Sequence, residues 1–129
     1  MKKILSLALV ACIVLTLSLV CFSGCFLFKS VSLDEVKSNL ENAGYEVTVM
    51  SGDDYVESEE NPYPFLLSSE LKTYLYAVNG TDEIHLYFFW TTDDASDNYD
   101  FMNNSKLTSG QINDVIYFAT KQAKKDAGI

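Results

Sequence analysis

Hydrophobic residues with helical spacing begin at residue 33. Four of them recur every three or four positions and so share one face of a helix: Leu33, Val36, Leu40 and Ala43. Just before them, Ser32 and Glu35 form a Ser-x-x-Glu capping box, in which each side chain satisfies a free backbone N–H at the helix start. Gly44 is suited to end the helix, because glycine adopts the left-handed conformation at little cost. The pattern predicts a helix over residues 33–43.

A strand and a long acidic connection follow. Residues 45–50 alternate between apolar and polar side chains, which predicts a half-buried strand. Residues 51–69 are acidic and contain two prolines, and connections longer than about 12–15 residues are uncommon in compact domains. We expect a solvated loop that the apolar residues 65–67 dock onto the core. A calcium site built from its carboxylates is an alternative, although no spacing matches an EF-hand loop.

The hydrophobic pattern next predicts a β-hairpin. Residues 71–78 and 81–91 both read as strands, and Asn79-Gly80 lies between them. Asn-Gly is the preferred centre of a two-residue type I′ turn, which requires positive φ at both positions. A turn centred there places Val78 opposite Thr81 and Leu75 opposite Ile84. One face of this hairpin is then apolar and is expected to pack against helices.

The opposite face of the hairpin is also rich in aromatic residues, although one face of an antiparallel sheet is usually polar. Aromatic side chains that carry polar groups are favoured at interfaces. This face is the candidate binding surface, and three readings of it stay open: a stacking surface for a sugar, peptide or partner protein, a surface covered by residues 51–69, or tyrosines that bridge half-buried positions in a thin sheet. Its members are Tyr74, Tyr76, His85, Tyr87 and Phe89.

The C-terminal third is predicted to contain a helix within residues 91–105, a loop over 103–110, a strand over 114–118 and a short helix over 120–127. Strands that mostly turn back on themselves, together with a few helices, favour an α+β fold. We therefore expect a small two-layer sandwich in residues 32–129, with about four mainly antiparallel strands and helices on one face.

The N-terminal segment has a different pattern. Lys2 and Lys3 precede a mostly apolar run over residues 4–20, which is typical of a secretory signal peptide. Ser23-Gly24-Cys25 then resembles the lipobox of bacterial lipoproteins. That resemblance implies cleavage between Gly24 and Cys25, a diacylglycerol on the Cys25 thiol, and a short tether over residues 25–31. Residues 1–24 would be the signal peptide, for which we expect a helix.

Two rival readings of this segment are weaker. Cleavage before Cys12 would leave too short an apolar core, and Cys21 follows the large residue Val20. A retained transmembrane helix is the other alternative, since residues 4–28 are long enough to span a bilayer. The lipobox resemblance implies a cell-membrane lipoprotein on the extracytoplasmic face. In outline the chain also resembles small lipoproteins of Gram-positive bacteria.

Charge narrows the range of partners. The chain contains nine lysines, no arginine and eighteen acidic residues, for a net charge of −9. Removal of Lys2 and Lys3 with the signal peptide leaves 7 − 18 = −11. A surface this acidic repels nucleic acid and the anionic face of a membrane, so the membrane is expected to be contacted through the lipid. Cys12 and Cys21 would also be lost, which leaves no intrachain disulfide.

Candidate chemistry is sparse. We expect no cofactor, no metal and no catalytic residues, because the mature part has one histidine, no free cysteine and no nucleophile motif such as Gly-x-Ser-x-Gly. The favoured function is an extracytoplasmic binding or accessory module that recognises a peptide or glycan. A structural or regulatory partner of another envelope protein is the alternative, and an enzyme is the least favoured class.

Overall fold

The computed structural model describes residues 30–102 and 106–129. Gly24, Cys25 and the rest of the N-terminal segment lie outside these residues. Val31–Ile129 forms one compact unit. No helix in the described part of the chain is long and apolar enough to cross a membrane.

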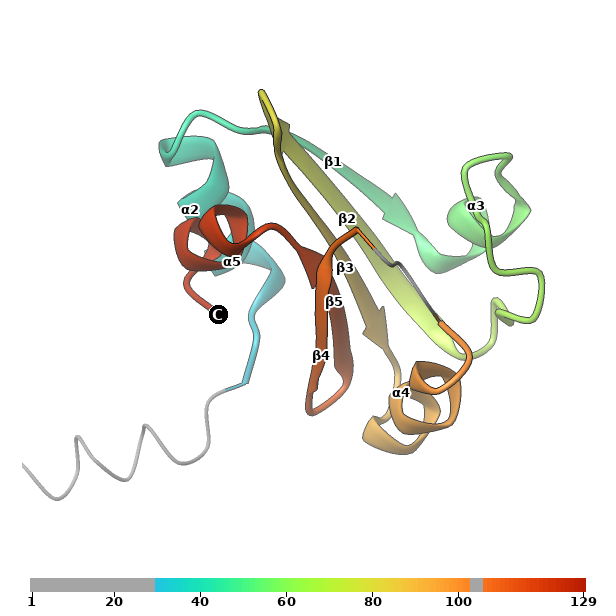
Figure 1. The fold of residues 1–129 in the computed structure, drawn as a ribbon. Coiled ribbons are helices and arrows are strands. Elements are labelled where there is room, and N and C mark those ends of the chain that lie inside the picture. The colour runs from blue at the N-terminus through green and yellow to red at the C-terminus, as the bar shows by residue number, and fades with distance from the viewer. Residues whose placement is uncertain (1–29, 103–105) are drawn as a thin grey trace, which may run out of the picture. The chain divides into compact units, whose positions relative to one another are not determined.

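The centre of this unit is an open sheet of five antiparallel strands in the order β1-β2-β3-β5-β4 (Figure 1). The fold is therefore α+β, as predicted, with one strand more than expected. The additional strand lies where the sequence predicted a loop, and it pairs with β5 at the edge of the sheet. The strands are β1 (Glu46–Ser51), β2 (Leu71–Asn79), β3 (Asp82–Phe89), β4 (Thr108–Ile112) and β5 (Val115–Ala119).

Four helices occur in the described residues: α2 (Leu33–Asn42), α3 (Gly52–Glu57), α4 (Thr92–Tyr99) and α5 (Lys121–Ala127). Each begins after a Ser or Thr whose hydroxyl accepts a backbone N–H three residues later, which satisfies one of the free donors of the first turn. The predicted helices over 33–43 and 120–127 are present with nearly the predicted bounds. Helix α3 was not predicted, because it lies within the acidic connection.

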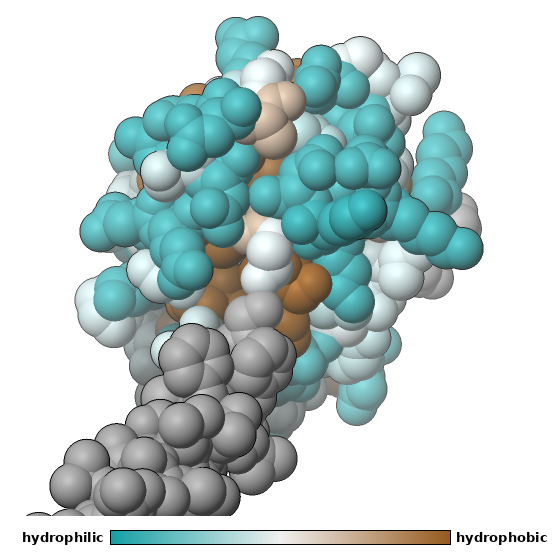
Figure 2. Space-filling model, turned by 90° about the vertical axis from the view of Figure 1, so that its left-hand side faces the viewer, coloured by the Kyte–Doolittle hydropathy of each residue, from teal (hydrophilic) through white to brown (hydrophobic). Residues whose placement is uncertain are grey.

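The helices cover both faces of the sheet, so the prediction of helices on one face was wrong. Helices α2 and α5 pack on one face, where their buried residues join Leu75, Ile84 and Leu86 in a mainly aliphatic cluster. Seen from the side of α2 and α5, hydrophilic side chains cover most of the surface, and hydrophobic side chains show in a strip between them (Figure 2).

The other face is covered by α3, α4 and part of the connection between α3 and β2. Tyr55 of α3, Tyr63 and Leu66 of the connection, and Ala95 of α4 belong to a second buried cluster on this face. Figure 1 shows α3 and α4 across the sheet from α2 and α5. Helices cover both faces because both faces of the sheet carry large apolar or aromatic side chains, and burying either face removes apolar surface from water.

The β2–β3 hairpin has a different register from the predicted one. Asn79 pairs with Asp82, and Tyr76 pairs with His85, so the turn is formed by Gly80 and Thr81. Of these two residues only Gly80 has a positive φ, 62°, which fits a type II′ turn rather than type I′. The register differs by two residues. An even shift keeps side chains on their predicted faces, and the five residues of the candidate binding face do share one face. Leu71 is an exception, because an irregularity between Leu71 and Thr73 turns it into the aromatic cluster, whereas the sequence predicted it on the opposite face.

Candidate functional site

The five predicted residues of the binding face do lie on one face of the sheet, but most of them are covered. Tyr74, Tyr87 and Phe89 are 5%, 3% and 0% exposed. Tyr76 and His85 remain half-buried. Cover by residues 51–69 therefore holds for most of this face, and the open aromatic surface is reduced to the part near Tyr76 and His85. The rest serves as the second hydrophobic core.

The covered part is a cluster of tyrosines. The ring of Tyr55 stacks on that of Tyr74 with centroids 4.0 Å apart, and its hydroxyl lies 2.9 Å from the Tyr87 hydroxyl. This hydrogen bond satisfies two buried polar groups that would otherwise be costly. Burial raises the pKa of Tyr55 to about 12, and it also raises the pKa of Tyr74 and of Tyr87. The tyrosines are therefore neutral at physiological pH.

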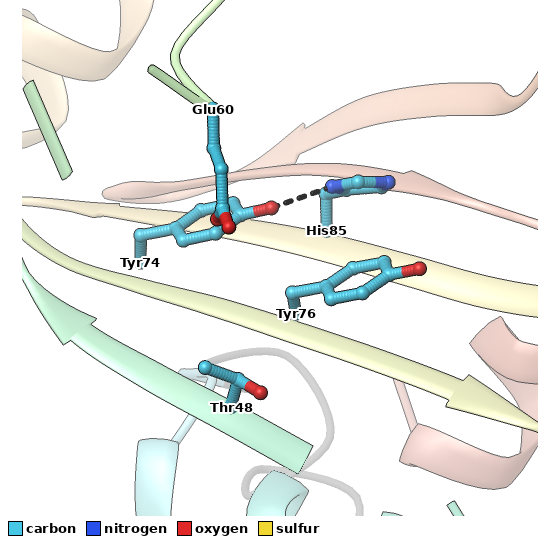
Figure 3. Close-up of a pocket in the computed structure, with 5 residues that line it drawn as sticks. All are labelled: Thr48, Glu60, Tyr74, Tyr76 and His85. Carbon is cyan, nitrogen blue, oxygen red and sulfur yellow. Dashed lines mark hydrogen bonds between the residues drawn. The ribbon is translucent and has the colours of Figure 1, made fainter. Parts of the chain in front are cut away.

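Beyond this cluster, the second face opens into a hollow of about 440 Å³ lined by Thr48, Glu60, Tyr74, Tyr76 and His85. A smaller pocket of about 80 Å³ shares Glu60, Tyr74 and His85 with it. The floor of the hollow is a row across neighbouring strands, since Thr48 pairs with Tyr76 and Tyr76 pairs with His85. Glu60 reaches down from the connection between α3 and β2 (Figure 3).

His85 is held by a neighbouring tyrosine. Its Nδ1 atom lies 2.8 Å from the Tyr74 hydroxyl, and its ring centroid lies 4.8 Å from that of Tyr76. When the Tyr74 hydroxyl donates to Nδ1, the neutral imidazole carries its proton on Nε2. Burial lowers the pKa of His85, although the charge of Glu83 opposes this effect. The imidazole is thus neutral at pH 7 and its orientation is fixed.

The electrostatic environment of the hollow is negative. After the larger effect of burial, the charges of Glu60 and Glu83 further raise the pKa of Tyr74 and of Tyr76, because a nearby negative charge disfavours ionisation of a phenol. No lysine is among the residues that line the hollow. In the described residues, no hydrogen bond or ion pair joins the Glu60 carboxylate to another side chain.

A second surface was missed by the sequence reasoning. Residues 65–67 were expected to dock on the core, but only Leu66 is buried, whereas Phe65 and Leu67 are 39% and 54% exposed. They line a hollow of about 320 Å³ with Glu70, Asp97, Asn98 and Phe101. Phe101 is 71% exposed and its ring lies 5.9 Å from that of Phe65. An apolar run in a loop does not by itself reveal which side chains face the solvent.

Neither surface has the ligand set of a metal centre. In residues 30–102 and 106–129, no group of three or more His, Cys, Asp and Glu side chains is arranged to hold a metal ion. Within the hollow at His85, Glu60 supplies the one carboxylate and His85 the one imidazole among the five lining residues. The arrangement is suited to stacking, hydrogen bonding and attraction of positive charge.

Comparison of the chain with protein-family models, curated proteins and solved structures found no match. What indicates a function is therefore the geometry of the two surfaces and the pattern of the N-terminal sequence.

Proposed function

We propose that the chain is a lipid-anchored, extracytoplasmic binding or accessory module whose ligand site is the hollow lined by Thr48, Glu60, Tyr74, Tyr76 and His85. The observation that carries the proposal is this hollow, where aromatic and polar side chains of the sheet remain accessible although the rest of the same face is covered. Its volume of about 440 Å³ falls within the usual range for small-molecule sites, about 300–1,000 Å³.

The location rests on the N-terminal sequence. A basic start, an apolar run and Ser23-Gly24-Cys25 favour cleavage before Cys25 and acylation of its thiol. In a Cys25→Ser variant we expect loss of lipid labelling, with the protein either released from the membrane fraction or retained as an unprocessed precursor. Ser23→Ala is the matched control, because alanine also meets the small-residue requirement. Unchanged lipid labelling of Cys25→Ser would overturn the anchor.

The ligand site is tested by a thermal-shift screen of the full chain against a mixed panel of small cations, sugars and short peptides. A ligand that stabilises the wild type should lose its effect in Tyr76→Ala, which removes one wall of the hollow. Phe101→Ala, at the second hollow, should respond like the wild type. A ligand whose effect survives in Tyr76→Ala and disappears in Phe101→Ala would move the site to the second hollow.

The alternative function is a structural or regulatory partner of another envelope protein. It is favoured by the exposed Phe65, Leu67 and Phe101, since exposed clusters of large apolar residues are typical of protein interfaces. Recovery of one stoichiometric protein with the lipidated chain, lost in Phe101→Ser but retained in Tyr76→Ala, would favour this function over the first.

A further inference from the structure

The rings of the hollow form a continuous aromatic surface. The centroid of His85 lies 4.8 Å from that of Tyr76 and 6.1 Å from that of Tyr74. Glu60 extends toward these rings from the opposite side, as Figure 3 shows, while Thr48 offers a hydroxyl at the edge of the floor. A ligand in the hollow would therefore contact aromatic rings on one side and a carboxylate on the other.

The charges around the hollow are negative. The faces of aromatic rings carry partial negative charge and attract cations within about 6 Å of the ring centroid. Glu60 lines the hollow, and Glu83 lies two residues before His85 on the same strand face. The tyrosines and His85 are neutral at pH 7, so none of the lining side chains provides a positive charge. An anion would be repelled, and a neutral ligand would gain nothing from this field.

At two aromatic rings outside the hollow, a lysine of the same chain makes a cation–π contact. Lys72 Nζ lies 5.2 Å from the ring centroid of Trp90, and Lys124 Nζ lies 4.8 Å from that of Tyr117. Both rings thus have an ammonium group from the same chain above them. The rings of the hollow, which also have a carboxylate beside them, have no lysine among their lining residues.

We propose that the hollow binds a small organic cation, with an alkylammonium group placed between the half-buried rings of Tyr76 and His85 and the carboxylate of Glu60. This inference rests on the proposed function and specifies the class of its ligand. Cation–π attraction to the rings and the charge of Glu60 would both favour a cation over a neutral ligand of the same shape.

The experiment compares two probes of the same shape. Choline carries a quaternary ammonium, and 3,3-dimethylbutan-1-ol replaces the charged nitrogen with carbon. Each is titrated at constant ionic strength into the full chain in a nonionic detergent, and the aromatic NMR signals of Tyr76 and His85 are followed. We expect choline to shift these signals with a dissociation constant at least about fivefold lower than that of the alcohol, given roughly 1 kcal/mol for a partly exposed cation–π contact.

Glu60→Gln should raise the dissociation constant for choline by about two- to fivefold and leave that of the alcohol unchanged, since it removes one exposed charge and keeps the side-chain shape. Glu59→Gln, a neighbouring exposed carboxylate that does not line the hollow, is the control and should bind choline as the wild type does.

Failure of cation selectivity can be distinguished from failure of the binding hollow itself. Equal binding of choline and the alcohol, or stronger binding of a neutral methyl glucoside at the same signals, would overturn the cation inference and leave the binding hollow intact. Choline shifts of similar size at Tyr76 and along the acidic helix α4 would indicate general attraction to the acidic surface and would also overturn the inference. No shift of Tyr76 or His85 with any probe of the mixed panel would overturn both.

Discussion

Under α2 and α5 the sheet is packed mainly with aliphatic side chains, whereas under α3 and α4 it is packed mainly with tyrosines and phenylalanines. The aliphatic cluster depends mainly on close packing, because most of its side chains have no polar atoms; Tyr45, one of its two tyrosines, donates its hydroxyl to Asp126. The aromatic cluster must also pair its hydroxyl groups, as Tyr55 does with Tyr87 and Tyr74 does with His85. No buried side-chain N or O atom of the described residues is left without a partner.

The difference explains where the candidate site lies. A sheet face rich in tyrosine can be buried at one end and exposed to water at the other, because each tyrosine ring has an apolar body and a polar hydroxyl. The bond from Tyr74 to His85 joins the covered part to the open hollow. On the aliphatic side, by contrast, an uncovered stretch of sheet would expose mainly hydrocarbon.

We expect the largest change in the free energy of unfolding from a substitution in the aliphatic cluster. Leu86 is fully buried, and Leu86→Ala should lower the free energy of unfolding by about 2–5 kcal/mol through lost burial and the cavity left behind. Urea denaturation measures this loss. Val49→Ala is the control, since Val49 is 41% exposed and should change stability much less. A Leu86→Ala loss below about 1 kcal/mol would show that the aliphatic cluster does not dominate stability.

The aromatic side should show coupling between polar groups. Tyr55→Phe or Tyr87→Phe alone leaves the other hydroxyl buried and unpaired, so each should cost about 1–3 kcal/mol of unfolding free energy. The double variant should cost clearly less than the sum of the two, because it removes both polar groups together. Additive losses in this double-mutant cycle would contradict the hydrogen bond as a source of stability.

We expect the smallest change in stability from the titration of His85 as the pH is lowered. Burial lowers the pKa of His85 in the folded state below its ordinary value of 6.5, so between these two values the unfolded chain binds more protons. Stability from the neutral imidazole is therefore fully present above pH 6.5 and is lost as the pH falls from 6.5 through the lower pKa of the folded state. His85 is the chain's one histidine, so His85→Gln should remove this part of the acid dependence measured between pH 7.5 and pH 5. An identical pH profile for both proteins would contradict the burial of His85.

Much of the fold follows from short-range pattern. The Ser32–Glu35 capping box and the alternation within β2 and β3 identify a helix and two strands from a few neighbouring residues. The edge strand β4 was not predictable in this way, because Thr108–Ile112 has little alternation and is a strand through its pairing with β5. The predictions at Cys25 concern residues outside the described ones and stay predictions.

By itself the sequence determined which residues of the candidate binding face lie together, because that assignment depends on a period of two and survives a register shift of two; it failed at Leu71, where the pairing is irregular. It also determined that both faces would be rich in apolar or aromatic groups. Only the tertiary structure decided which aromatic residues are covered, because this depends on how residues 52–70 and α4 fold back across the sheet. The hollow at Tyr76 and His85 exists where that long-range cover ends.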